Sequence, residues 1–80
     1  MNWGIKEMND VDELFKEYIC CLGVTIKNMR KCRNMSLRSL SAAARVNLEF
    51  LKDIETGSVN PSLKNIYNIM YVLKCSNWIY

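Results

Sequence analysis

The sequence predicts a small all-α fold, a bundle of four to five helices in a single domain. Three observations favour this class. Apolar residues recur at intervals of three or four positions, and no stretch alternates in the manner of a β-strand. Capping residues, together with Gly57 and Pro61, fall between the apolar segments. The length of 80 residues is sufficient for one domain only.

The first helical segment is expected to begin at Asp10, which forms an N-terminal capping pattern with Glu13. Apolar residues then follow at helical spacing as far as Met29. Gly23 lies inside this pattern, although Gly costs about 1 kcal/mol relative to Ala in a helix. The segment therefore either runs through Gly23 or divides into helices over 11–22 and 24–33, and its apolar stripe stays in phase in both cases.

Two short helices are expected next. Ser36 is a favourable N-cap for a helix from Leu37 to Ala44, and Asn47 is one for a helix from Leu48 to Glu55. Only two residues lie between the first of these helices and Asn47, so the connection is a tight turn. Two short helices joined by a turn of about three residues are typical of the helix-turn-helix motif.

The chain is expected to end in one more helix and a short apolar tip. Gly57 occupies the usual position just after a helix, and Pro61 with Ser62 starts the next one. Apolar residues show helical spacing again over 63–73. The tip, which is too short for a full helix, consists of Trp78, Ile79 and Tyr80.

The net charge of +3 is the sum of two opposed parts. Residues 1–21 hold two Lys and five acidic residues, a net charge of −3. Residues 22–80 hold nine Lys and Arg residues and three acidic ones, a net charge of +6. A basic body behind an acidic leader favours binding to a polyanion, because local charge decides such binding. The alternative is that both parts simply present solvated charged faces.

The composition weighs against catalysis and against a metal or cofactor site. The chain has no His, the commonest general base and metal ligand. Its four Cys form no C-x-x-C pair, so we expect free thiols in a reducing cytoplasm. No signal peptide is recognisable, and no apolar stretch approaches the roughly 18–20 residues that cross a bilayer. We therefore expect a cytoplasmic protein that is not an enzyme, binds no cofactor or metal and does not insert into a membrane.

A series of landmark residues runs through the chain from Leu22 to Ser76. In order they are Leu22-Gly23, Ile26, Arg30, Ser36, Leu40, Val46, Leu51, Ile54, Glu55-Thr56-Gly57, Asn60-Pro61-Ser62-Leu63 and Val72-Leu73-Lys74-Cys75-Ser76. Their order and spacing resemble the small repressor-type helix-turn-helix domains of phage and bacterial regulators, the Cro/C1-type or XRE class. The resemblance implies a lambda-repressor-like domain over 22–76, preceded by an acidic leader helix over 1–21 and followed by the apolar tip over 77–80.

The resemblance also assigns structural roles. Arg30 and Glu55 match a pair that often forms a partly buried salt bridge between the first and third helices of this class. Two independent surface charges are the alternative. The class usually has Gly with a positive φ at the first turn residue, where this chain has Arg45 at a cost of about 1 kcal/mol. The matching core positions are Val46, Leu51 and Ile54.

In domains of this class the start of the third helix enters the DNA major groove and reads base edges. The matching positions here are Leu48, Glu49, Phe50, Lys52 and Asp53. This set is unusual, because most members have Gln, Asn, Ser, Arg or Lys there. Apolar side chains can contact thymine methyl groups and a carboxylate can accept a hydrogen bond from cytosine. However, two acidic residues at this place would face a polyanion.

Phosphate contacts are expected from cations and from polar groups near helix N-termini. The expected residues are Ser36, Arg38, Arg45, Asn47, Asn60 and Lys64. Four or five such contacts would give a salt dependence with a slope of roughly −4.

The sequence thus predicts a sequence-specific DNA-binding transcriptional regulator, a small repressor that acts as a homodimer on a palindromic operator of double-stranded DNA. A dimer is expected because one short helix reads too few base pairs. Its surface is either the leader helix, through Val11, Phe15 and Tyr18, or the C-terminal tip, although both could equally cover the domain's own core. The alternative function is a module that binds a protein partner, as an antirepressor or a regulator of another protein, through an apolar patch around Leu48 and Phe50.

Overall fold

The computed structural model describes the backbone of residues 7–75 and the side chains of residues 11–74. Within this part of the chain there are four helices and no strand, which confirms the predicted all-α class. The helices are α1 (Glu7–Cys32), α2 (Leu37–Ala44), α3 (Leu48–Thr56) and α4 (Leu63–Cys75). The predicted C-terminal tip lies outside the described residues.

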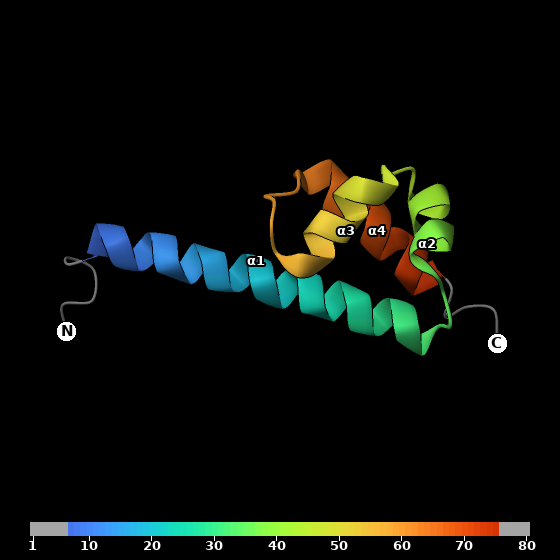
Figure 1. The fold of residues 1–80 in the computed structure, drawn as a ribbon, viewed down its shortest axis with the longest axis horizontal. Coiled ribbons are helices and arrows are strands. Elements are labelled where there is room, and N and C mark those ends of the chain that lie inside the picture. Colours follow the sequence, from blue (N-terminus) through green and yellow to red (C-terminus); the bar gives the residue numbers. More distant parts are fainter. Residues whose placement is uncertain (1–6, 76–80) are drawn as a thin grey trace.

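The long helix α1 is the element on which α3 and α4 pack. Helices α3 and α4 contact α1, and α2 contacts α3 and α4. All three lie along the C-terminal half of α1, whereas its N-terminal half extends beyond them (Figure 1). The molecule consequently measures 48 × 26 × 19 Å. The 26 residues of α1 span about 39 Å at 1.5 Å per residue, so α1 determines most of the longest dimension.

Helix α1 differs from the predicted segment at its start. It begins at Glu7 rather than at Asp10, which therefore lies within the first turns of the helix and not at its cap. Of the two alternatives at Gly23, the structure has the continuous helix, which passes through Gly23 without a break.

Gly23 has a packing role that the sequence pattern does not reveal. It is buried, and a Cβ atom at this position would clash with the carbonyl oxygen of Ile54 and lie 2.8 Å from that of Glu55. The missing side chain thus allows α1 to approach the C-terminal end of α3 closely. This contact explains a residue that is otherwise unfavourable in a helix interior.

The predicted caps of α2 and α3 are confirmed. The side-chain oxygen of Ser36 accepts a hydrogen bond from the backbone N–H of Ser39 at 3.0 Å. Asn47 accepts one from the backbone N–H of Phe50 at 3.1 Å. Gly57 follows α3 with a φ of 77°, as expected for a residue just after a helix. Helix α3 ends at Thr56, one residue later than predicted.

Helix α4 begins at Leu63, so Pro61 and Ser62 precede the helix rather than form its first turn. The hydroxyl oxygen of Ser62 accepts a hydrogen bond from the backbone N–H of Asn65 at 3.1 Å. The side-chain oxygen of Asn65 in turn accepts one from the backbone N–H of Ser62 at 3.3 Å. This reciprocal exchange is a capping box, which satisfies two backbone donors at the start of the helix.

All four helices contribute to one hydrophobic core. Its largest side chains, which are fully buried, each stabilise the fold by about 1.5–3 kcal/mol relative to exposure. Val46, Leu51 and Ile54 are among the buried residues, as the sequence predicts. Among the described residues, the core cluster contains Ile26, Leu40, Ala44, Val46, Leu51, Ile54, Ile69 and Leu73, and Ile19 is buried as well.

An ion pair joins α1 to α3 beside this core. The Nε atom of Arg30 lies 2.7 Å from Oε2 of Glu55, and Nη2 lies 3.0 Å from Oε1. The third guanidinium nitrogen, Nη1, donates to the carbonyl oxygen of Met35 at 2.8 Å. Both charged residues are buried, with 7% and 8% of their surface exposed. The buried ion pair therefore links α1 to α3, and the third hydrogen bond of Arg30 links α1 to the segment that leads to α2.

Candidate nucleic-acid interface

The turn between α2 and α3 consists of three residues, Arg45, Val46 and Asn47. Arg45 has the left-handed conformation, with a φ of 59° and a ψ of 43°. The backbone N–H of Val46 donates to the carbonyl oxygen of Ser41 at 3.1 Å, and the Ser41 hydroxyl donates to the carbonyl oxygen of Val46 at 2.6 Å. These two hydrogen bonds and the burial of Val46 fix the direction in which α3 leaves α2.

The apolar residues at the start of α3 are less exposed than a docking patch requires. Leu48 and Phe50 are both half-buried, and Phe50 packs against the core. The large exposed apolar side chains of the described residues lie on α1 and α4 instead. Leu48 and Phe50 therefore offer only part of their apolar surface to a partner.

The charged residues on α3 partly neutralise each other. Glu49 and Lys52 are exposed, and the Nζ atom of Lys52 lies 3.4 Å from Oε2 of Glu49. Such an exposed pair contributes well under 1 kcal/mol to stability, so Lys52 can leave Glu49 for another anion at little cost. Asp53 is half-buried one residue further along the chain. With one cation and two carboxylates, this part of α3 offers little general attraction to phosphates.

All six residues expected to contact phosphates are exposed, but they are occupied in different ways. The side chains of Ser36 and Asn47 already accept the capping hydrogen bonds of α2 and α3. Arg38 lies in the first turn of α2, and Arg45 and Lys64 lie beside a hollow between α2 and α4. The cations, rather than the capping residues, are the groups best able to bind an anion.

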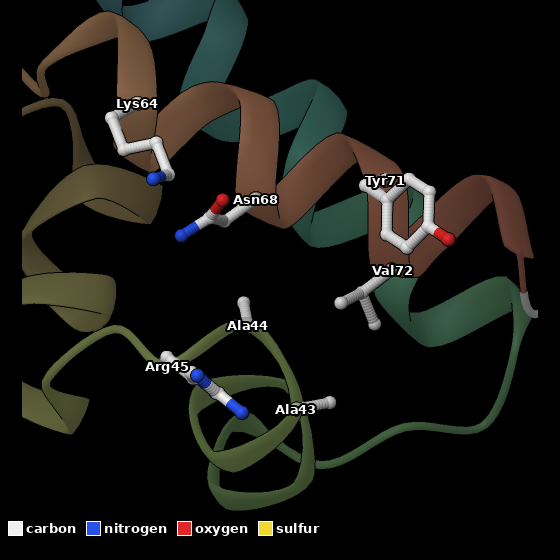
Figure 2. Close-up of a pocket in the computed structure, with 7 residues that line it drawn as sticks. All are labelled: Ala43, Ala44, Arg45, Lys64, Asn68, Tyr71 and Val72. Carbon is white, nitrogen blue, oxygen red and sulfur yellow. The ribbon is translucent and has the colours of Figure 1, made fainter.

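The hollow between α2 and α4 has a volume of about 300 Å³ and opens to solvent. Lys64 and Asn68 extend over it from α4, and Arg45 lies across from them at the end of α2 (Figure 2). No acidic residue is found among the described residues that line it. Two cations and an amide around one small hollow can hold a phosphate group, because all three supply hydrogen-bond donors. Its other lining residues are Ala43, Ala44, Tyr71 and Val72.

The sequence reasoning missed Asn68 and Tyr71 as neighbours of the two cations. The signal was present, because Lys64, Asn68 and Tyr71 follow one another at intervals of four and three residues and so share one side of α4. Asn60, by contrast, does not lie at this hollow. It lines a separate groove together with Phe15 and Tyr18 of α1.

Cys20, Cys21 and Cys32 are free, exposed thiols. Among the described residues no cluster of three or more His, Cys, Asp or Glu side chains is placed to bind a metal ion. The described helices also include none with both the length and the apolar character needed to cross a membrane.

Comparisons of the chain with protein-family models, curated protein sequences and solved structures find no significant match.

Proposed function

We propose that this chain is a helix-turn-helix DNA-binding protein of the XRE type and that it regulates transcription as a homodimer. In this proposal α2 lies across the DNA backbone and α3 enters the major groove. The proposal rests on residues of this chain and on its resemblance to that class.

The observation that carries the proposal is the geometry of α2, the turn and α3. Two short helices of 8 and 9 residues are joined by a three-residue turn, with an N-cap at Ser36 and another at Asn47. Val46 anchors the turn in the core, and Arg45 takes the positive φ that the motif requires at this place. This geometry supports the proposal, because a helix-turn-helix motif presents the first turn of its second helix to a groove of DNA.

Affinity in this proposal comes mainly from cations outside α3. Arg38, Arg45 and Lys64 bind phosphates, and Lys52 adds a fourth contact when it leaves Glu49. Four contacts give a slope of about −4 for the logarithm of affinity against the logarithm of salt concentration. Binding to arbitrary DNA is therefore weak at physiological salt.

Specificity in this proposal comes from the acidic and half-buried residues of α3. Glu49 accepts a hydrogen bond from the amino group of a cytosine and is repelled by nearby phosphates, so it penalises other registers. Leu48 and Phe50 offer only part of their surface to thymine methyl groups. Two half-sites about one helical turn apart are needed to reach useful specificity, because each α3 reads few bases.

Selection from a randomised duplex library at two salt concentrations tests the proposal. We expect enrichment of a palindromic consensus whose half-sites lie about 10 base pairs apart, centre to centre. An Arg45→Ala/Lys64→Ala variant should lose enrichment, whereas Lys27→Ala, which removes an exposed cation on α1, should keep it. The absence of any consensus at both salt concentrations would contradict sequence-specific binding and favour a protein partner instead.

A further inference from the structure

The N-terminal half of α1 carries an apolar stripe that the other described residues leave exposed. Val11, Leu14, Phe15 and Tyr18 each expose between 47% and 63% of their surface. They continue, at helical spacing, the stripe that packs on the core further along α1 through Leu22 and Ile26. Helices α2 and α3 lie along the C-terminal half of α1, and α4 borders this stripe only at its own start (Figure 1). A contiguous exposed patch of this kind marks an interaction surface.

A groove of about 250 Å³ extends this surface towards α4. Phe15, Tyr18 and Leu22 form its wall on α1, and Pro61 and Leu63 face them from the other side. Leu63 is the most exposed of the large apolar residues in the described chain, at 85%. The apolar surface is therefore continuous from α1 across the groove to the start of α4.

The same surface continues along α4. On α4, Tyr67 lies four residues after Leu63, and Lys74 lies seven residues after Tyr67. The three residues therefore share one side of the helix. The rings of Tyr67 and Tyr71 are stacked with their centroids 6.2 Å apart, and both residues are exposed. Tyr side chains are enriched among the residues that dominate binding energy at protein interfaces.

The charges on the two helices are opposite. Residues 7–18 of α1 include five acidic residues and one Lys, whereas α4 has two Lys and no acidic residue. Pairing the N-terminal halves of two α1 helices with each other would bring like charges together. Packing that half of α1 on α4 of another copy brings opposite charges together, so complementarity favours α4 as the partner surface.

We propose that the N-terminal half of α1 packs against the exposed side of α4 in a second copy of this chain. In the two-fold form of this contact, each copy packs its α1 on the other copy's α4, so the assembly closes as a dimer and does not extend further. This interface rests on the proposed function only because that function leads us to expect a dimer. The hollow that Arg45 and Lys64 line shares Tyr71 with this surface, so the dimer contact borders the hollow.

Sedimentation equilibrium of the full chain without DNA tests the interface. We expect a dimer of two 9.3 kDa chains at micromolar concentration. Leu14→Glu places a charge in the apolar stripe, and Tyr67→Glu places one on the opposing surface. Each should raise the dimer dissociation constant more than tenfold, and Lys74→Glu should raise it several-fold. Circular dichroism should show unchanged helix content in all three variants, because the three side chains are exposed.

Val24→Glu is the matched control for Leu14→Glu, because Val24 is an apolar residue on α1 with similar exposure but lies outside the stripe. This variant should keep the dimer. A monomeric parent chain at high micromolar concentration would overturn the proposal. Equal weakening by Val24→Glu, or a dimer that tolerates both Leu14→Glu and Tyr67→Glu, would overturn it as well. DNA binding does not enter these measurements, so their failure is distinguishable from failure of the proposed function.

Discussion

The guanidinium group of Arg30 donates hydrogen bonds to both carboxylate oxygens of Glu55, at 2.7 and 3.0 Å, and both residues are buried. Removing one partner of such a pair leaves a buried charge without compensation. We expect Glu55→Ala to lower the free energy of unfolding by about 3–5 kcal/mol in urea denaturation. Glu49→Ala, which removes a carboxylate from an exposed pair, should change it by less than about 1 kcal/mol.

A double variant separates the cost of the unpaired charge from the value of the pair. Arg30→Met combined with Glu55→Leu removes both charges, so it should recover most of the stability that Glu55→Ala loses. A double variant as unstable as Glu55→Ala would show that the lost hydrogen bonds, including the one to the Met35 carbonyl, dominate the effect.

The second prediction concerns the contact between Gly23 and the end of α3. Ala is favoured over Gly in a helix by about 1 kcal/mol, so propensity alone predicts that Gly23→Ala stabilises the chain. The clash with the Ile54 carbonyl oxygen predicts the reverse. We expect a loss of about 1–3 kcal/mol, as for other overpacked positions, measured by thermal and urea unfolding. Thr25→Ala, at an exposed position nearby, should be neutral or slightly stabilising.

Local sequence signals predicted most of the fold. The caps at Ser36, Asn47 and Gly57 depend on a few neighbouring residues, so their positions could be predicted and are confirmed. The packing role of Gly23 could not be predicted, because the carbonyl group that a Cβ atom would meet lies more than thirty residues further along the chain. The start of α4 differs from the prediction for a local reason: the exchange of hydrogen bonds between Ser62 and Asn65 outweighs the preference of Pro61 for a first helical turn.

The candidate site was less predictable than the fold. The exposure of Phe50 depends on how α3 is rotated about its axis against the core. A pattern of residue types does not determine this rotation closely enough to say whether Phe50 faces the core or the solvent. Arg45 and Lys64 lie at the same hollow because α2 packs against α4, and local spacing does not specify this packing. The resemblance placed both residues near DNA, but only the structure places them at one hollow together with Asn68.

The third prediction uses Phe50 to distinguish a core role from a docking role. Because Phe50 is half-buried against the core, Phe50→Ala should lower the free energy of unfolding by about 1–3 kcal/mol, less than the cost at a fully buried Phe. Thermal denaturation measures the change. Val24→Ala, at an exposed position outside the proposed dimer surface, should leave the melting temperature almost unaltered. An unchanged melt for Phe50→Ala would revive the partner-docking alternative.

The fourth prediction concerns Lys52, which is held by Glu49 at 3.4 Å in the free protein. If Lys52 turns to a phosphate on binding, Lys52→Ala should weaken binding to all duplexes and make the salt slope shallower by about 1. Glu49→Gln should act in the opposite direction, with tighter binding to random duplexes and poorer discrimination among sequences. Fluorescence anisotropy across a salt series measures both effects. An unchanged slope for Lys52→Ala would exclude a phosphate contact by this residue.

The last prediction separates stability from binding at Arg45. Its φ of 59° lies in the left-handed region, which a non-Gly residue adopts at a cost of roughly 1 kcal/mol. Arg45→Gly removes this cost and should raise the free energy of unfolding by up to about 1 kcal/mol. The same change removes a cation from the hollow beside Lys64, so DNA affinity should fall and the salt slope should become shallower by about 1.

Asn34→Gly is the matched control, because Asn34 also has a positive φ, of 56°, and is not expected to contact DNA. It should stabilise the chain slightly and leave binding unaltered. Equal binding losses in the two variants would show that the loss comes from backbone flexibility and not from the missing guanidinium group.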